Sequence, residues 1–318
     1  MPNQPRKDFP QLTWDDRMTA DWQRLLALAL AEDLGDAGAD GLPLDLTTSA
    51  LVPRTVAGRT AIVARQGGVL AGLRAVGPTL HAIDTAVTFQ TAVGDGDTVG
   101  QGGEVGRIEG PAHSILMAER LVLNLLGHLS GIATLTRRYV DAIAGTGARI
   151  YDTRKTTPGW RRLEKYAVRC GGGCNHREAL FAAVLIKDNH LALGAEASES
   201  GAGFSPADAV RRARRWLQQQ QGPAADSIVE VEVDTLAQLE AVLPAGPDVV
   251  LLDNMTPSML HEAVALRNRV GPGVELEASG GVDLATVRAI AESGVERISV
   301  GALTHSAPSL DLGLDWLA

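Results

Sequence analysis

This chain of 318 residues holds little lysine, cysteine or aromatic residue, and each shortage excludes a class of protein. Two cysteines are too few for a disulfide scaffold. An aromatic content of 4% argues against a surface that stacks nucleic-acid bases, and a formal net charge of −9 argues against a general nucleic-acid binder, so we expect no nucleic-acid partner. The longest strictly apolar run, residues 179–186, is too short to span a bilayer, and residues 1–11 hold no apolar stretch of the secretory kind. We therefore expect a cytoplasmic protein with no membrane partner.

The scarce lysines are clustered. Only four occur, and Lys155, Lys165 and Lys187 fall within 33 residues of one another. The surrounding segment, residues 152–190, has eight Lys and Arg against four Asp and Glu, so its local charge is opposite in sign to that of the whole chain. A lysine ammonium is a compact point charge, whereas an arginine guanidinium is a planar fork, so the two are not interchangeable. The reversal indicates a site for a multiply charged anion, although a solvated basic helix face would have the same composition.

The first part of the chain mixes two periodicities. A hydrophobic fraction of 45% is ample for a packed core. Apolar residues follow helical spacing over 22–34, 73–83 and about 113–144, and strand-like runs lie at 58–64, 86–92 and 105–108. We predict an N-terminal α+β sandwich domain over residues 1–123.

The second part alternates short β-branched runs with helical patterns. The runs span residues 149–151, 183–186, 228–233, 248–252, 274–278 and 297–300. Such alternation is typical of parallel βα units. We predict an α/β fold in which residues 124–307 form an incomplete (β/α) barrel of about six parallel strands. A doubly wound open sheet is the alternative, and it is disfavoured because no glycine-rich fingerprint follows a first strand.

Polar or small residues follow every one of these strands. In a (β/α) barrel the carboxyl ends of the strands converge on one face, which holds the active site. The first two strands contribute basic groups, the next two acidic groups, and the last two small residues that expose backbone N–H groups to a phosphate. In chain order the segments are DTRK at 152–155, KDNH at 187–190, EVEVD at 230–234, DN at 253–254, SGG at 279–281 and GA at 301–302. Together they predict a site for a phosphorylated sugar and a second anion.

Longer motifs carry a specific resemblance. The segments EGPAHSILMAERLVLNLLGHLSGIAT, DTRKTTPGWRRLEKYAVRCGGGCNHR, LIKDNH, LLDNM, EASGG and VGALTHSAPSLDLGLD, with EDLG and DLTT nearer the start, closely resemble the quinolinate phosphoribosyltransferase family. The resemblance covers residues 25 to 315. It implies transfer of the phosphoribosyl group of 5-phosphoribosyl 1-pyrophosphate to quinolinate, with loss of CO₂, to give nicotinate mononucleotide and pyrophosphate in NAD biosynthesis. It also implies a requirement for Mg²⁺, a homodimer or a hexamer of dimers with shared sites, and a C-terminal tail, 308–318, that packs on the N-terminal domain.

The resemblance assigns a role to individual residues. Arg120 would reach quinolinate from the neighbouring subunit. Lys155 and Lys187 would lie near pyrophosphate and substrate, and Glu232 and Asp253 would lie at the ribose and its metal. The quinolinate clamp would comprise Thr153, Arg154, His176 and Arg177, and the 5′-phosphate cradle would comprise Ser279, Gly280, Gly281, Val300, Gly301 and Ala302, with His305 close by.

Other interpretations remain open at this point. The chain could be a related barrel transferase that acts on another aromatic acid or on a molybdenum-linked substrate, or it could be a phosphate-binding barrel without catalysis. Cys170, Cys174 and His176 hint at zinc, but they lack the usual spacing and a clear fourth ligand, so two reduced thiols are favoured. Residues 194–203 have the composition of a surface loop or of a lid over the site.

Overall fold

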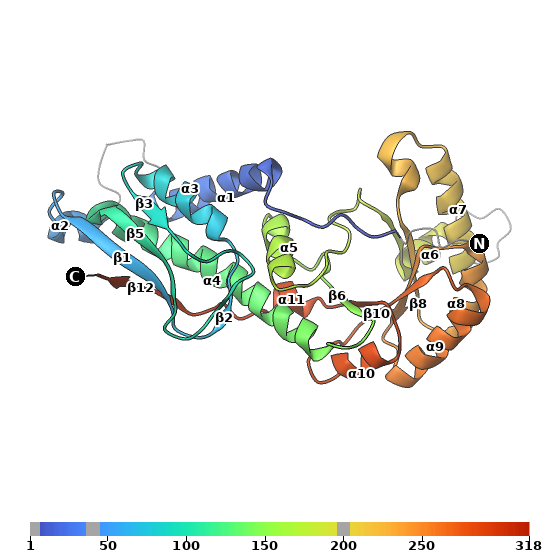
Figure 1. Cartoon of the computed structure of the whole chain (residues 1–318). Coiled ribbons are helices and arrows are strands. Elements are labelled where there is room, and N and C mark those ends of the chain that lie inside the picture. Colours follow the sequence, from blue (N-terminus) through green and yellow to red (C-terminus); the bar gives the residue numbers. More distant parts are fainter. Residues whose placement is uncertain (1–6, 36–44, 196–203, 318) are drawn as a thin grey trace. The chain divides into compact units, whose positions relative to one another are not determined.

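In the computed structural model, residues 7–35, 45–195 and 204–317 are described, and they form two compact units (Figure 1). The barrel unit comprises residues 7–11, 138–155 and 173–302, and the sheet unit comprises residues 12–137, 156–172 and 303–317. Each unit therefore contains pieces from distant parts of the chain. The domain boundaries inferred from the sequence stay a prediction, and most of the segment proposed as a lid lies outside the described residues.

The barrel unit is built on a parallel sheet of six strands in the order β6-β11-β10-β9-β8-β7. The two strands that come first in this unit, β6 and β7, lie at its two edges, and the later strands fill the space between them in sequence order. A doubly wound sheet would instead place its first strand in the middle. The predicted α/β fold with six parallel strands is confirmed. The strands are β6 (Arg149–Tyr151), β7 (Val184–Ile186), β8 (Val229–Val233), β9 (Val249–Asp253), β10 (Glu275–Ser279) and β11 (Arg297–Ser299).

Helices follow most of these strands and begin at capping side chains. Ser205 caps α7, Thr235 caps α8 in a capping box with Gln238, and Thr256 caps α9. These caps fix the points at which the chain leaves the strand ends and turns back along the outside of the sheet (Figure 1). The helices of this unit are α6 (Asp188–Ala195), α7 (Pro206–Gln218), α8 (Leu236–Val242), α9 (Pro257–Val270) and α10 (Val287–Glu292), with short 3₁₀ turns at Gly222–Asp226 and Leu243–Ala245. Helix α11 (Ala302–His305) follows β11 and belongs to the sheet unit from Leu303 onward.

The sheet unit packs helices on a four-stranded sheet in the order β12-β1-β5-β3. Strand β12 pairs antiparallel with β1, with Leu314 opposite Ile62, so the end of the chain completes this sheet. Ile62, Ile108 and Leu126 are fully buried in the core between the sheet and its helices. The elements are α1 (Asp16–Leu34), α2 (Leu46–Leu51), β1 (Ala57–Ala64), β2 (Gly68–Val69), α3 (Leu73–Ile83), β3 (Thr88–Gln90), β4 (Thr98–Val99), β5 (Glu104–Pro111), α4 (Ala112–Ala142), α5 (Arg161–Cys170) and β12 (Leu312–Trp316).

Helix α4 is the one described helix with the length and apolar composition to cross a membrane. Its most apolar window is 61% buried inside the structure. Ile115, Leu126 and Leu129 on this helix are fully buried. The apolar composition of α4 therefore matches that of a core helix.

Gly131 on α4 is required by a close approach within the sheet unit. A Cβ built on Gly131 would lie 2.1 Å from the carbonyl oxygen of Pro308. We expect Gly131→Ala to lower the free energy of unfolding by about 1–3 kcal/mol, because the backbone at 308–309 would have to move. Gly77→Ala is the matched control, since Gly77 also lies in a helix and its Cβ would meet nothing within 4 Å. The control should leave stability unchanged or raise it by up to about 1 kcal/mol. Chemical denaturation measures both, and equal midpoints for the two variants would contradict the packing.

Candidate active site

Six predicted site residues line one cavity of about 260 Å³ in the barrel unit. Thr153, Arg154 and Lys155 follow β6 and Lys187 follows β7, as the convergence of parallel strands requires. His176 and Arg177 come from the segment between α5 and β7. The cavity also contains four residues that the sequence analysis did not assign to the site. The predicted residues are Thr153, Arg154, Lys155, His176, Arg177 and Lys187, and the additional ones are Leu185, Leu251, Glu277 and Ser299.

The cavity carries a concentration of positive charge. Arg154, Lys155, Arg177 and Lys187 line it together. Burial and the neighbouring charge of Arg154 lower the pKa of Arg177, while Glu230 acts in the opposite direction. A partly buried cation whose pKa is lowered by a neighbouring cation favours an anionic ligand. The arrangement therefore suits a small molecule with more than one carboxylate or phosphate group.

Local hydrogen bonds orient the two lysines. The backbone N–H of Lys155 donates to Thr153 Oγ1 at 3.0 Å, which closes a tight turn after β6. The backbone N–H of Lys187 donates to His190 Nδ1 at 2.9 Å at the start of α6. The Lys187 ammonium also contacts the carboxylate of Glu232. Lys155 is thus held on the turn that follows β6, and Lys187 on the turn that follows β7.

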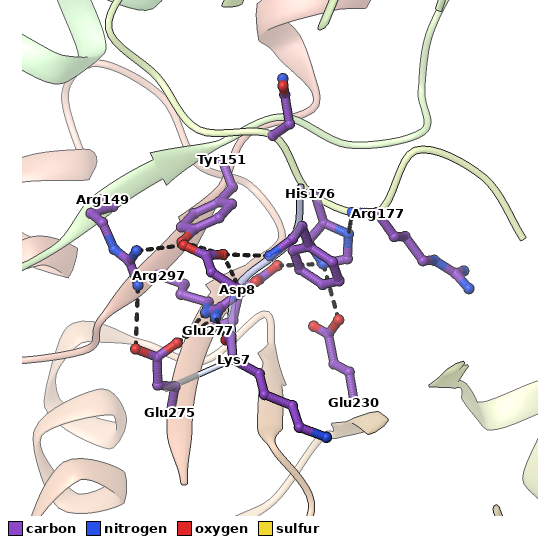
Figure 2. Close-up of polar contacts among 12 residues, drawn as sticks. Lys7, Asp8, Arg149, Tyr151, His176, Arg177, Glu230, Glu275, Glu277 and Arg297 are labelled. Atoms are coloured by element: carbon purple, nitrogen blue, oxygen red, sulfur yellow. Dashed lines mark hydrogen bonds and ion pairs between the residues drawn. The ribbon is translucent and has the colours of Figure 1, made fainter. Parts of the chain in front are cut away.

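The imidazole of His176 is held from several sides (Figure 2). Its Nδ1 accepts the backbone N–H of Arg177 at 2.8 Å, so the proton of the neutral ring lies on Nε2. Nε2 lies 3.0 Å from Glu230 and 3.6 Å from Glu277, and Figure 2 shows Glu230 pointing toward the ring. Both ring nitrogens therefore already face protein groups, and the ring orientation depends on those groups.

Glu230 and Glu277 are fully buried on strands β8 and β10. One oxygen of each and Nε2 of His176 lie within 4.8 Å of one another, a spacing that suits a shared proton or a small cation. Burial and, after it, the charge of Glu230 raise the pKa of Glu277 to about 7, although the charges of His176 and Arg297 act in the opposite direction. A carboxyl group with this pKa holds a proton for much of the time near neutral pH, which removes the need for a further cation.

The ends of β9 and β10 approach each other closely. Asn254 is the one described non-glycine residue with a positive φ, 53°, and its backbone N–H donates to the Ser279 carbonyl at 2.9 Å. A Cβ on Gly280 would lie 2.2 Å from Asn254 Oδ1, so a glycine is needed at that position. Gly280 and Gly281 have φ values of 90° and 59°, which favour glycine. This strained segment leaves both glycines lining a second cavity of about 400 Å³.

The remaining predicted residues lie at other positions. Glu232 and Asp253 are near the ends of β8 and β9, and Val300 to Ala302 directly follow β11. Arg120 lies on α4 of the sheet unit, in a separate cavity of about 400 Å³ that it shares with Asp33 and Trp160. His305 ends α11 and lies within the sheet unit, where its Nδ1 is 2.7 Å from Ser306 Oγ. The roles assigned to these residues stay predictions.

Three further residues that the sequence analysis singled out do not line this cavity. Cys170 and Cys174 are not joined by a disulfide and lie in different units, and burial raises the pKa of Cys170 to about 12. Lys165 is fully buried on α5 of the sheet unit. Of the clustered lysines, Lys155 and Lys187 are therefore the ones in the cationic cavity.

Sequence reasoning did not assign Glu277 and Glu230 to the site. Each carboxylate stands in a largely buried strand in which glutamates alternate with apolar residues, in the sequences ELEAS and VEVEV. Buried charges in such strands are rare unless they are paired or functional, so this pattern was the available signal. The pattern could not reveal that the two carboxylates share His176 as a partner, because His176 lies far from both strands in sequence.

Comparison with known proteins gives a consistent result. Residues 45–130 match the N-terminal domain of quinolinate phosphoribosyl transferase, and residues 132–315 match its C-terminal domain. Nicotinate-nucleotide pyrophosphorylase (carboxylating) of Mycobacterium leprae is 42% identical over 274 residues, covering 86% of this chain and 91% of that protein. A quinolinate phosphoribosyltransferase (decarboxylating) of Nicotiana tabacum is 38% identical over 311 residues, covering 93% and 82%. The solved nicotinate-nucleotide pyrophosphorylase of Francisella tularensis has a TM-score of 0.84 and 32% identity, covering 98% of this chain and all of that one.

The raised pKa of Glu277 leads to a prediction about stability and pH. Because the pKa in the folded state, about 7, lies above the ordinary value of 4.5, folding takes up a proton between these values. The contribution of Glu277 to stability is then present below about pH 4.5 and declines as the pH rises to about 7. Glu277→Gln cannot lose this proton, so we expect it to gain stability relative to the wild type across that range, on the order of 2 kcal/mol. Urea denaturation at a series of pH values tests this, and parallel curves for the two proteins would contradict it.

Proposed function

The chain belongs to the quinolinate phosphoribosyl transferase family, and from this premise we propose that it joins quinolinate to the phosphoribosyl group of 5-phosphoribosyl 1-pyrophosphate. The products are nicotinate mononucleotide, pyrophosphate and CO₂. The observation that carries the proposal is the cavity of the barrel unit that two arginines, two lysines and His176 line together. Quinolinate has two carboxylates, and the forked guanidinium groups of Arg154 and Arg177 match carboxylates in a bidentate manner. A single carboxylate would leave more of this charge unmatched.

Departure of pyrophosphate is the first chemical task of the site. The anomeric carbon gains positive charge as the bond to pyrophosphate breaks, while negative charge grows on the leaving group. Lys155 and Lys187 supply point charges for that leaving group, and the carboxylates of Glu232 and Asp253 oppose the positive charge at the ribose. The contact between Lys187 and Glu232 supports this division of roles. It places the positive group that faces pyrophosphate beside the negative group that faces the ribose.

Magnesium is the cofactor that this reading requires. The carboxylates of Glu232 and Asp253 fit it, because they are hard oxygen ligands near the ends of the adjacent strands β8 and β9. Glu232 contacts Lys187, and Asp253 accepts from Asn254 at 2.7 Å, so both would hold Mg²⁺ in part through its waters. The ion, when bound, adds positive charge to the diphosphate.

The 5′-phosphate would bind at the ends of β10 and β11. Ser279, Gly280 and Gly281 follow one strand, and Val300, Gly301 and Ala302 follow the next. The left-handed glycines at 280 and 281 expose backbone N–H groups without a covering side chain. Phosphate sites after the last two strands are common in this architecture.

Loss of CO₂ needs no separate cofactor in this scheme. Once the pyridine nitrogen is bonded to the ribose carbon, it carries a positive charge. The electron pair left by the adjacent carboxylate stays on the ring carbon beside that charge, and a proton then replaces CO₂ there. The site has only to hold the pyridinium in place while this occurs.

We further propose that the protein acts in the cytoplasm as a homodimer, or as a hexamer of dimers, in NAD biosynthesis. Arg120 would then complete the quinolinate clamp of the partner subunit. Its exposure on α4, beside a cavity in the sheet unit, supports a role toward a molecule outside its own unit. A monomer with full activity would contradict this assembly.

The decisive experiment compares two pyridine acids. Purified protein is mixed with Mg²⁺, 5-phosphoribosyl 1-pyrophosphate and either quinolinate or nicotinate. We expect CO₂, pyrophosphate and nicotinate mononucleotide with quinolinate alone, and none of these products when Mg²⁺ is chelated. Turnover with nicotinate only would show that the chain catalyses the reaction of a related transferase instead. Absence of pyrophosphate with every acid would support a binding protein instead.

The two lysines of the cavity should be required for turnover. We expect Lys155→Ala and Lys187→Ala each to lower kcat by a factor on the order of 10² or more, as is usual for preorganised groups that stabilise a departing charge. Arg269→Ala is a charge-matched control, because it removes one positive charge from an exposed position on α9. Steady-state kinetics on folded proteins measure the effect. Near-normal kcat in Lys155→Ala or Lys187→Ala would exclude the assigned role for that lysine.

A further inference from the structure

A short segment before the first helix, residues 7–11, lies against the amino-terminal ends of the barrel strands (Figure 2). The carboxylate of Asp8 lies 2.7 Å from Arg149 Nη1 and 3.4 Å from Arg297 Nη1, and it accepts the Tyr151 hydroxyl at 3.1 Å. Arg149 and Arg297 are the first residues of β6 and β11. Asp8 therefore anchors the segment at the end of the sheet opposite the strand ends that bear the site.

Phe9 extends from this anchor into the unit. Its side chain is 3% exposed and packs in a buried cluster with Tyr151 and Ala183. The Arg297 guanidinium lies 5.4 Å from the centroid of the Phe9 ring, and the His176 ring centroid lies 4.4 Å from it. Phe9 thus touches both the charged layer at the strand starts and a residue of the substrate cavity.

Gln11 holds the neighbouring backbone. Its Oε1 accepts the Asn175 N–H at 2.7 Å, and its Nε2 donates to the Asn175 carbonyl at 3.2 Å and to the Phe9 carbonyl at 2.7 Å. One side chain therefore engages both backbone groups of the residue before His176. The amide fixes the path of the chain between Cys174 and His176 from the side of the N-terminal segment.

The restraint extends from Asn175 to the cavity. Asp152, which is fully buried, accepts the Asn175 side-chain amide at 2.6 Å and the His176 backbone N–H at 2.8 Å. The Arg177 N–H donates to His176 Nδ1, and Arg177 Nη1 donates to the Ala183 carbonyl at 3.1 Å. A shift of the His176 ring would therefore change the hydrogen bonding of Arg177, which lines the cavity.

We propose that Phe9 and Gln11 are positioning residues of the active site, which set His176 and Arg177 for the carboxylates of the pyridine substrate. The proposal rests on the proposed function for the identity of that substrate. Neither residue lines the cavity, so each acts through His176 and Asn175. The described contacts of the segment reach the first residues of β6 and β11 and the backbone of Asn175, whereas the residues assigned to the 5′-phosphate follow the opposite ends of β10 and β11. The effect should therefore be confined to one of the two substrates.

Steady-state kinetics of Gln11→Ala and Phe9→Leu test this. Gln11→Ala removes three hydrogen bonds from a half-buried position, and Phe9→Leu removes the ring while keeping an apolar side chain. We expect the KM for quinolinate to rise roughly tenfold in each, as follows from the loss of one or two net hydrogen bonds or a ring contact. The KM for 5-phosphoribosyl 1-pyrophosphate should stay within about twofold of the wild-type value, because its binding groups are untouched.

Two controls separate positioning from general damage. Lys7→Ala, in the same segment, removes an exposed contact between Nζ and the Asp226 carbonyl and should leave both KM values unchanged. Gln11→Glu keeps an acceptor for the Asn175 N–H but places a negative oxygen against the Phe9 and Asn175 carbonyl oxygens, so its KM for quinolinate should rise at least as much as that of Gln11→Ala. Thermal unfolding verifies that each variant is folded.

The outcomes are distinct. Unchanged quinolinate KM in folded Gln11→Ala and Phe9→Leu would overturn the proposal, and so would an equal rise in both KM values. Wild-type turnover is measured first in the same assay. A wild type inactive with quinolinate would count against the proposed function, whereas an active wild type with unaffected variants would count against the positioning role alone.

Discussion

Charges buried inside the six-stranded sheet must be compensated by one another, and the site depends on this constraint. Arg297 is fully buried, and its guanidinium pairs with Glu275 and Asp8. A buried ion without partners costs several kcal/mol, so removal of one member would leave another uncompensated. The network therefore requires the N-terminal segment to be in place, since Asp8 comes from that segment.

The residues that line the substrate cavity differ from this network, because their charges are not balanced by one another. Arg154, Lys155 and Arg177 line a cavity in which Glu277 is the one carboxylate among the lining residues. The pKa of this carboxyl group is raised to about 7, so it is protonated for about half of the time at neutral pH and offsets only part of the positive charge. Paired charges at the starts of the strands thus support a cavity with excess positive charge, which an anionic substrate can balance.

The sequence predicted the six strands and the groups at their ends because these features are local. Period and turn residues locate β6 to β11 within one or two residues, and DTRK or SGG follows directly in the chain. Pairings such as Arg297 with Asp8 join residues nearly 290 positions apart, and no local pattern encodes them. The same reason applies to α5, which follows β6 in sequence but packs in the sheet unit. Helix α1 begins at Asp16, earlier than the apolar spacing indicated, because Asp15 caps it.

The scarcity of lysine also has a physical explanation in this arrangement. Where charge is buried and must satisfy carboxylates in fixed geometry, the chain uses arginine: both Nη atoms of Arg267 grip Glu296, at 3.0 and 2.8 Å. A lysine at such a position has no forked guanidinium, so it would lose one of these two hydrogen bonds. Lys155 and Lys187 instead extend from exposed or half-exposed turns beside the cavity, where a flexible stem and a compact charge suit the leaving-group role proposed for them. Lys165, fully buried, is the exception, which shows that clustering in sequence alone does not separate a catalytic lysine from a packed one.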